Sequence, residues 1–277
     1  MIWVDGRIVP EQELSISVLD RTFEHGLGLI ETTRTWSGRA PLLDRHLARL
    51  RNSARELGLP LDASQLPDAG GVAELLRADG LDGDVALRLT LTGGLSELAG
   101  SVLWMRAAAL PPPMVQAGAG AVVDYGPWRV ERDDALLRHK TLNYWRRRNA
   151  YQQARASGFD EVVSLSDGPV FWEGSRTNLF LVAEATLITP ALSGPIVPGI
   201  MRGLVIELAR ANRIVVREVP ALELWAIEEA EEIFLTNSVR GIIPVSRLGT
   251  MEWDGPGAVT ATFQRSVTAI LRKGELT

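Results

Sequence analysis

The sequence contains no cysteine, only three histidines and, among its 29 lysine and arginine residues, only two lysines. The lack of cysteine excludes disulfides and thiolate metal sites, and so few histidines argue against zinc catalysis. The formal net charge of −5 provides no basic surface of the kind that binds nucleic acid or an anionic membrane. We therefore expect a protein that acts on small molecules and carries no metal.

No apolar stretch reaches the roughly 18 residues that a membrane span needs. The first residues, MIWVDGRIVP, lack the charged, apolar and small-residue segments of a secretory signal. With 277 residues, 46% of them hydrophobic, the chain has material for one large or two medium cores. These features predict a globular, cytoplasmic protein.

Helical and strand-like patterns occur in clusters along the chain, without regular alternation. Asp5-Gly6 between two short apolar runs predicts a hairpin, and leucines spaced by three and four residues predict a helix over 41–60. Three consecutive prolines mark the clearest linker. The pattern predicts an α+β chain with a small domain over residues 1–110, a linker over 111–117 and a larger domain over 118–277.

The later part of the chain is mixed as well. Strand patterns follow residue 160, with turns expected at Asp167-Gly168 and Glu173-Gly174. A helix is expected to begin at about Ile200, after a Pro-Gly pair. EEIFLTN then predicts a buried strand, and the last segment, PGAVTATFQRSVTAILRKGEL, predicts a helix.

Lys140 is one of only two lysines in a chain that uses arginine for nearly every other cation. Only lysine can lose its proton and attack a carbonyl as a free amine. The neighbouring Arg138 and His139 favour the neutral, nucleophilic amine. Lys140 is therefore either a surface lysine in an ordinary ion pair or an imine-forming amine. The second interpretation predicts pyridoxal phosphate as the cofactor.

Two segments are candidates for binding the cofactor phosphate. PGIMRGLVIELA places Ile200 and Met201 in the first turn of a helix, where free amides and the positive end of the dipole attract an anion. In FLTNSVRG, Asn237 and Ser238 follow a buried strand and offer side-chain donors. Each segment also has a plain structural explanation, a Pro-Gly helix start and a strand-end turn.

Glu173, in FWEGSRTNLF, is the candidate partner of the cofactor's pyridine nitrogen. Two aromatic residues precede it and a glycine follows, so we expect a partly desolvated carboxylate fixed at a tight turn. A carboxylate there keeps the ring nitrogen protonated and lets the ring accept electrons. Alone, Glu173 is an ordinary turn residue. Together with Lys140 and the two phosphate segments it favours a cofactor site.

The segments HKTLNYW, DEVVSLSDGPVFWEGSRTNLF, PGIMRGLVIELA and FLTNSVRGIIPV occur in this order, after an N-terminal H-x-x-R-L. With them the chain resembles, over nearly its whole length, the fold-type IV pyridoxal-phosphate enzymes. That family includes branched-chain aminotransferases, D-amino-acid transaminases and 4-amino-4-deoxychorismate lyases. The resemblance implies a two-domain α+β architecture, pyridoxal 5′-phosphate as cofactor, and a homodimer that works in amino-acid metabolism.

The resemblance also implies roles for individual residues. Lys140 is the implied Schiff-base and proton-transfer residue, and Glu173 the implied partner of the pyridine nitrogen. The other implied cofactor contacts are Arg49, Tyr144, Ile200, Met201, Asn237 and Ser238.

Around the substrate the sequence departs from each subgroup of that family. Ile30 stands where the branched-chain enzymes carry an aromatic residue, and TLTGGLSELAGSV lacks both the R-x-H pair of the D-amino-acid enzymes and the R-G pair of the lyases. A substrate carboxylate still requires a cation. The candidate substrate residues are Ile30, Arg88, Arg176 and Arg240.

We predict amino-group transfer from an α-amino carboxylate. One alternative is a 4-amino-4-deoxychorismate lyase, which releases pyruvate on the route to 4-aminobenzoate and folate. A second alternative is a catalytically inactive binding homologue, against which the presence of both Lys140 and Glu173 argues.

Overall fold

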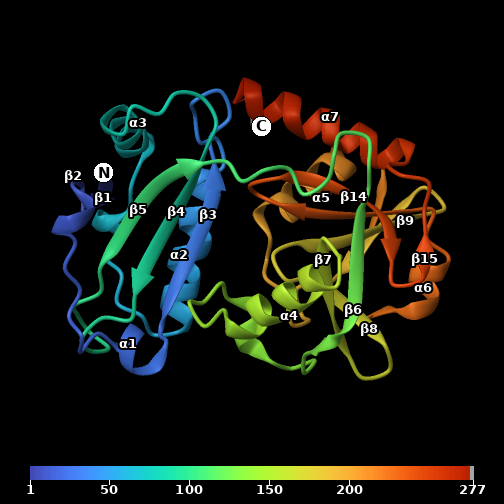
Figure 1. The fold of residues 1–277 in the computed structure, drawn as a ribbon, viewed down its shortest axis with the longest axis horizontal. Coiled ribbons are helices and arrows are strands. Elements are labelled where there is room, and N and C mark those ends of the chain that lie inside the picture. Colours follow the sequence, from blue (N-terminus) through green and yellow to red (C-terminus); the bar gives the residue numbers. More distant parts are fainter. Residues whose placement is uncertain (275–277) are drawn as a thin grey trace. The chain divides into compact units, whose positions relative to one another are not determined.

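A computed structural model describes residues 1–274, except for the side chain of residue 127. It contains both helices and strands, as predicted for an α+β chain (Figure 1), and divides into two compact units. The first unit contains Met1–Pro111, Lys140–Asn143 and the described residues from Ile270 onward; the second contains Pro112–His139 and Tyr144–Ala269.

This division differs from the expected single uninterrupted domain over residues 118–277. The stretch Lys140–Asn143 counts with the first unit because its backbone pairs with a strand there, Ile30 N donating to Lys140 O at 2.9 Å. The chain from Ile270 onward also counts with it, since Arg39 donates hydrogen bonds to two carbonyls of the last helical turn. The second unit is therefore interrupted once, at Lys140–Asn143, and extends only to Ala269.

A five-stranded antiparallel sheet in the order β2-β1-β5-β4-β3 forms the centre of the first unit. The elements are β1 (Ile2–Val4), β2 (Arg7–Val9), η1 (Glu11–Glu13), α1 (Arg21–His25), β3 (Gly28–Arg34), α2 (Leu43–Glu56), η2 (Ala63–Gln65), α3 (Ala69–Ala78), β4 (Val85–Thr92) and β5 (Leu103–Ala109). The predicted hairpin joins β1 to β2, because Asp5 and Gly6 adopt the positive φ angles, 45° and 81°, that a two-residue turn requires.

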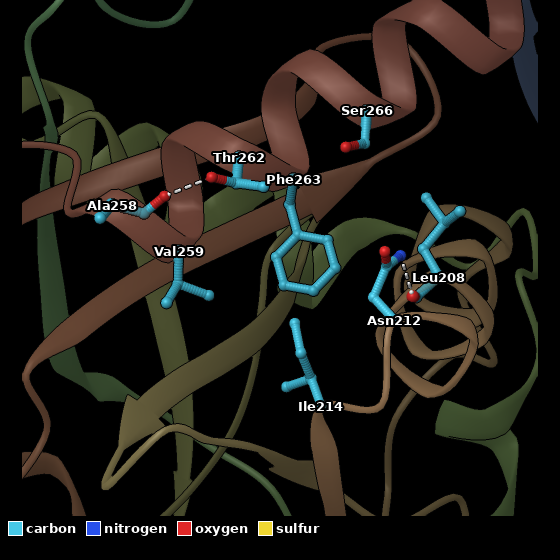
Figure 2. A pocket seen from close by; sticks show the side chains of 8 residues that line it. All are labelled: Leu208, Asn212, Ile214, Ala258, Val259, Thr262, Phe263 and Ser266. Atoms are coloured by element: carbon cyan, nitrogen blue, oxygen red, sulfur yellow. Dashed lines mark hydrogen bonds between the residues drawn. The ribbon is translucent and has the colours of Figure 1, made fainter.

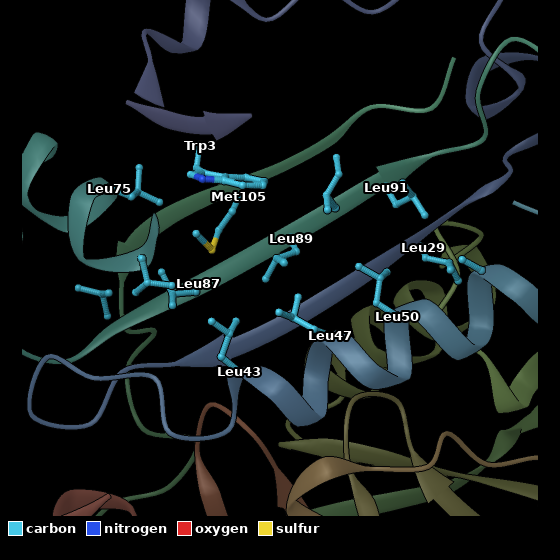
Figure 3. Packing of buried hydrophobic residues seen from close by; sticks show 14 of the residues in the cluster. Trp3, Leu29, Leu43, Leu47, Leu50, Leu75, Leu87, Leu89, Leu91 and Met105 are labelled. Atoms are coloured by element: carbon cyan, nitrogen blue, oxygen red, sulfur yellow. The ribbon is translucent and has the colours of Figure 1, made fainter. Parts of the chain in front are cut away.

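The core of the first unit lies between this sheet and the helices α2 and α3. Leu87, Leu89 and Leu91 alternate along β4, so they point to one face of the sheet. Leu47 and Leu50 of α2 pack against that face (Figure 3). Leucines at this spacing form one apolar stripe on a helix, which explains why α2 covers the sheet. Truncation of a fully buried leucine such as Leu89 costs about 2–5 kcal/mol.

A ten-stranded sheet in the order β11-β10-β9-β13-β14-β6-β7-β8-β12, with β15 paired to β14, forms the second unit. The elements are β6 (Ala121–Arg129), η3 (Ala135–Arg138), α4 (Trp145–Ala156), β7 (Glu161–Ser166), β8 (Val170–Gly174), β9 (Asn178–Ala183), β10 (Thr186–Pro190), α5 (Ile200–Ala211), β11 (Val215–Val219), β12 (Leu222–Glu223), α6 (Leu224–Glu228), β13 (Glu232–Asn237), β14 (Gly241–Leu248), β15 (Met251–Glu252) and α7 (Ala258–Lys273). Because β8 also pairs with β9, through Glu173 and Asn178, the strands β9, β13, β14, β6, β7 and β8 form a closed ring.

The helix α5 connects β10 to its parallel neighbour β11. It begins at Ile200 after Gly199, as predicted, and Leu204, Val205 and Ile206 are buried along it. Helix α7 is the predicted C-terminal helix. Over residues 1–274, no helix is both long and apolar enough to cross a membrane.

The strands after residue 160 follow the prediction except at Glu173. The turn at Asp167-Gly168 joins β7 to β8, as predicted. Glu173 and Gly174, however, are the last residues of β8, and the turn comes after them, so the predicted turn at this pair is wrong. A carboxylate is tolerated in this buried strand because neighbouring donors satisfy both of its oxygens.

Candidate active site

Lys140 is held by backbone hydrogen bonds along the edge of β3. Ile30 N donates to Lys140 O at 2.9 Å. Two residues later, Leu142 N donates to Gly28 O, also at 2.9 Å. Gly28 permits this approach, because its φ is 141° and a Cβ there would lie 2.6 Å from Leu91 O. The segment carrying Lys140 is therefore fixed to the sheet of the first unit.

The buried Glu31 and the partly buried Arg49 form an ion pair with two hydrogen bonds. Arg49 Nε donates to Glu31 Oε1 at 2.7 Å, and its NH2 donates to Oε2 at 2.6 Å. His46 Nδ1 lies 2.7 Å from the same Oε2. Burial opposes ionisation of Glu31, but the charge and hydrogen bonds of Arg49, joined by those of His46, lower its pKa to about 2. Glu31 is thus a buried carboxylate.

His46 is fully buried beside this ion pair. Its pKa lies below the usual value, chiefly because burial disfavours the imidazolium; the charges of Arg49 and Lys140 act in the same direction. The charge of Lys140 therefore acts on His46, next to Glu31 and Arg49. The structure thus brings two predicted cofactor residues, Arg49 and Lys140, into one part of the first unit. The contact of Arg49 with the phosphate stays a prediction.

The candidate substrate residues Ile30 and Arg88 lie on the other face of the same sheet. In the register of β3 and β4, Ile30 is opposite Thr90 and Thr32 is opposite Arg88. Successive residues of a strand alternate between faces, and Leu89 points toward α2. Ile30 and Arg88 therefore share the face that α2 does not cover. A role in substrate binding stays a prediction for both.

In the second unit, Glu173 is 2% exposed and receives donors on both carboxylate oxygens. Arg147 NH2 donates to Oε1 at 2.5 Å. Asn178 Nδ2 and Val197 N each donate to Oε2 at 3.1 Å. Charge-assisted bonds of this kind fix a carboxylate more firmly than neutral ones. Glu173 is thus a rigid, buried carboxylate, as the resemblance to the cofactor enzymes requires.

Arg147 was not predicted as a site residue. It is 7% exposed, and its guanidinium carbon lies 5.2 Å from the ring centre of Trp128 and 6.0 Å from that of Tyr144. Burial alone would lower its pKa, but Glu173, followed by Tyr144, raises it above the usual value. In the sequence Arg147 stands between Arg146 and Arg148, and only packing distinguishes the buried arginine from its exposed neighbours.

Glu173 lies at the edge of the sheet where several strands of one direction end. Strands β8, β10 and β13 all run antiparallel to β9, so their carboxyl ends meet at the edge where β9 begins. β8 ends there with Glu173 and Gly174, β13 ends there with Asn237, and α5 begins after β10. The Glu173 carboxylate, the side chain of Asn237 and the chain that leads into α5 therefore lie at one edge of the sheet.

The side chain of Asn178 connects the end of β8 with the loop before α5. Besides Glu173, its Nδ2 donates to Val197 O at 3.0 Å. Asn178, the first residue of β9, pairs with Thr236 of β13, which directly precedes Asn237. Gly199 lies against the side chain of Asn178. As the N-cap of α5, Gly199 has no side chain with which to cap the helix, and uncapped first amides of a helix attract an anion. The sequence segment GSRTNLF contained Asn178, but no spacing rule singled it out.

Two more predicted cofactor residues, Asn237 and Tyr144, form hydrogen bonds in the second unit. Asn237 Oδ1 accepts from Val239 N at 3.0 Å and from Arg240 N at 2.7 Å, so this oxygen fixes the turn after β13. Tyr144 Oη donates to Ser175 O at 2.9 Å, just after Glu173 and Gly174. These contacts position the two side chains. Their roles toward a cofactor, like that of Ser238, stay predictions.

Arg176 and Arg240, two candidate substrate residues, are neighbours. Arg176 stacks 3.7 Å above the Tyr151 ring, and its Nε is 4.0 Å from Glu161 Oε2. The pKa of Arg240 is lowered, first by burial and then by the charge of Arg176. Buried N–H groups of both guanidinium groups find no hydrogen-bond partner among the described residues. An anion between them would satisfy these donors.

A separate cavity of about 270 Å³ lies between the end of α5 and α7 (Figure 2). Leu208, Ile214, Val259 and Phe263 give it a largely apolar lining. The amide Nδ2 of Asn212 donates to Leu208 O at 2.8 Å, within the lining itself. No charged side chain lines this cavity, so it does not suit a phosphate or a carboxylate.

The described residues fit pyridoxal 5′-phosphate. A helix start without a side-chain cap suits its phosphate, the buried carboxylate of Glu173 suits its ring nitrogen, and Lys140 supplies an amine. All three requirements are met by side chains or amides that the fold holds in place.

Comparison with known proteins gives consistent matches. The family model described as amino-transferase class IV matches residues 28–248. A Methanocaldococcus jannaschii protein with the provisional name branched-chain-amino-acid aminotransferase is 32% identical over 253 residues, 88% of this chain and 86% of that protein. The aminodeoxychorismate lyase of Bacillus subtilis is 27% identical over 95% of this chain and 92% of its own length. A crystal structure of the branched-chain aminotransferase of Thermoproteus uzoniensis with norvaline superposes with a TM-score of 0.87 at 26% identity, covering 99% of this chain and 95% of that one.

Proposed function

Because the chain belongs to the class IV aminotransferase family of pyridoxal-phosphate enzymes, we propose that it transfers the amino group of an α-amino carboxylate to a keto acid. One observation carries the proposal: the buried Glu173 carboxylate, bound by Arg147, Asn178 and Val197 N at the edge where α5 begins. A carboxylate fixed in this way is suited to a ring nitrogen that has to stay protonated.

When bound, the cofactor supplies an electron sink that lets the α-carbon of an amino acid give up its proton. Lys140 is the proposed catalytic residue: its neutral amine takes up that proton and returns it at another carbon. The backbone hydrogen bonds to β3 hold the backbone of Lys140 in place, from which its side chain reaches the reacting atoms.

The phosphate is assigned to the amides of Ile200 and Met201, with Asn237 and Ser238 beside them. Two observations support this assignment. The start of α5 has no side-chain cap, and Asn178 both bonds to Val197 before α5 and pairs with Thr236 near the end of β13. Arg49 is proposed, as the resemblance implies, as a contact of the cofactor phosphate. Its fork already bonds Glu31, which holds the guanidinium in one orientation.

Arg176 and Arg240 are the proposed carboxylate-binding residues for the substrate. Two neighbouring guanidinium groups with unfilled buried donors favour an anion, and an α-amino carboxylate supplies one. Ile30 and Arg88, which share one sheet face, remain candidates for contacts to the rest of the substrate.

The proposal is tested by supplying D- and L-amino acids one at a time, each with a keto-acid acceptor, and measuring both products. Formation of equal amounts of the new amino acid and the new keto acid supports it and gives the stereochemical preference. Binding of the cofactor without transfer from any donor would contradict it.

The alternative is the lyase reaction, which the similarity to the Bacillus subtilis enzyme over 95% of this chain favours. The same lysine and carboxylate serve both reactions, so the outcome depends on how the substrate is held. Release of pyruvate from 4-amino-4-deoxychorismate, without any amino acceptor, identifies the lyase. The absence of pyruvate together with amino transfer excludes it.

We also propose that the chain is a cytoplasmic homodimer. Phe23 in α1 and Leu98 after β4 are 64% and 92% exposed, and Leu19 and Leu95 are exposed near them in the sequence. Arg21 Nε donates to Gly93 O at 3.0 Å and so connects these two segments, and we infer that a second copy covers their exposed apolar side chains. Light scattering checks the dimer, and cell fractionation checks the location. A monomer at micromolar concentration would contradict it.

A further inference from the structure

The side chain next to Glu173 is the least expected feature of the candidate site. Arg147 NH2 donates to Glu173 Oε1 at 2.5 Å, and both side chains are almost fully buried, at 7% and 2% exposure. No predicted function uses Arg147. A buried guanidinium costs desolvation energy, and this cost is offset only by a close, well-oriented anion.

The surroundings of Arg147 hold it in one place. Its guanidinium lies over the ring of Trp128 at 5.2 Å and near that of Tyr144 at 6.0 Å, on the first turn of α4. Besides Glu173, two titratable groups act on it: Tyr144, and then Glu161, which is fully buried and whose pKa burial raises. Glu161 therefore competes weakly for Arg147, and Glu173 is its main partner.

A guanidinium this close favours the ionised form of its partner. If Arg147 were neutral or absent, Glu173 would be a desolvated carboxylate without the charge of that guanidinium, although the neutral donors Asn178 Nδ2 and Val197 N would remain. Such a carboxylate is a stronger base and takes a proton from any weakly acidic N–H group that it faces.

We propose that Arg147 is a positioning residue that acts through Glu173: it holds this carboxylate ionised and fixed, so that the proton between Glu173 and the cofactor stays on the ring nitrogen. This inference rests on the proposed function, because it takes Glu173 as the partner of that nitrogen. It adds a residue that sets how strongly the bound cofactor accepts electrons.

The test is nitrogen-15 NMR of ring-labelled pyridoxal 5′-phosphate bound to the protein, recorded over a range of pH. The variants are Arg147→Met, Arg147→Gln and Arg147→Lys, with Arg148→Met as the matched control, since Arg148 is its exposed neighbour in α4. We expect the wild type, Arg147→Lys and Arg148→Met to show a protonated ring nitrogen. In Arg147→Met and Arg147→Gln the proton should leave the nitrogen at a pH about one unit lower or more.

The outcomes distinguish a failure of the role of Arg147 from a failure of the proposed function. A ring nitrogen in Arg147→Gln with the same chemical shift and pH dependence as in the wild type overturns the role of Arg147. Arg147→Gln keeps a donor of similar shape, so it provides the answer if Arg147→Met does not fold. A wild-type protein that fails to bind the cofactor, or a nitrogen signal unaffected by Glu173→Gln, overturns the proposed function itself.

Discussion

Gly199 lies so close to the side chain of Asn178 that a Cβ at residue 199 would overlap Asn178 Oδ1. Asn178 in turn donates to Glu173 Oε2 and Val197 O. The start of α5 and the buried carboxylate therefore depend on one small residue.

Gly199→Ala should accordingly weaken cofactor binding by about tenfold or more, because the added methyl group displaces Asn178 or the first turn of α5. Quenching of tryptophan fluorescence by pyridoxal 5′-phosphate measures the affinity. Gly203→Ala is the matched control: a Cβ there meets no heavy atom within 4 Å, and alanine in this helix should add up to about 1 kcal/mol of stability. Equal cofactor affinities for Gly199→Ala and the wild type would show that the protein accommodates the added methyl group beside Asn178 without loss of cofactor binding.

Lys140→Ala should abolish covalent attachment of the cofactor. In the wild type, reduction with sodium borohydride should leave the cofactor on the peptide that contains Lys140, as mass spectrometry detects. The chain provides its own control, since Lys273 is the single other lysine and lies in the last turn of α7. Lys273→Ala should retain the modification. Attachment to Lys273 in the wild type, or loss of the modification in Lys273→Ala, would contradict the assignment.

Glu31→Gln should lower the free energy of unfolding by roughly 1.5–3 kcal/mol, because the substitution removes the charge-assisted hydrogen bonds between the buried Glu31 and the partly buried Arg49. Urea denaturation measures the loss. The exposed Glu56, at the end of α2, provides the control, and Glu56→Gln should change stability by no more than about 0.5 kcal/mol. A loss below 1 kcal/mol for Glu31→Gln would mean that water or another group compensates Arg49.

The pH dependence of stability should follow from the lowered pKa values of His46 and Glu31. His46 takes up a proton more readily in the unfolded chain than in the folded one, so stability is complete above pH 6.5 and decreases below it. Glu31 adds a second decrease, from about pH 4.5 toward its folded pKa of about 2.

His46→Gln keeps a donor for Glu31 but does not titrate. Its unfolding free energy should therefore change less between pH 7 and pH 5 than that of the wild type. The exposed His25 is the control, and His25→Gln should keep the wild-type slope. If the unfolding free energy of His46→Gln changed more with pH than that of the wild type, folding would raise the pKa of His46 rather than lower it.

Arg176→Met and Arg240→Met should each raise KM for the amino acid by about tenfold or more, with a smaller change in kcat, if these residues bind the substrate carboxylate. Arg217→Met, at an exposed position of β11, should leave both constants unchanged. Unchanged KM values for both variants would show that the substrate carboxylate binds to other residues, and Arg88 would be the next residue to substitute.

The sequence predicted the α+β class, the first hairpin and the start of α5, because each depends on local signals such as Asp5-Gly6 or a Pro-Gly pair. Lys140 stood out because lysine is so rare in this chain. Arg147 did not stand out, since it is one of three consecutive arginines and only tertiary packing buries it. The turn expected at Glu173 was wrong for a related reason: the donors that allow this carboxylate in a buried strand come from distant segments.

The closed ring of strands in the second unit has a consequence for synthesis on the ribosome. β9 and β8 are made early, but the ring also needs β13 and β14, which end with Leu248. Until then the parallel pairing of β6 with β14 cannot form, and the backbone edges of β6 and β9 lack these partners. A nascent chain that stalls before Glu232 therefore has all the residues around Glu173 but not the ring that holds them, and we expect it to depend on a chaperone.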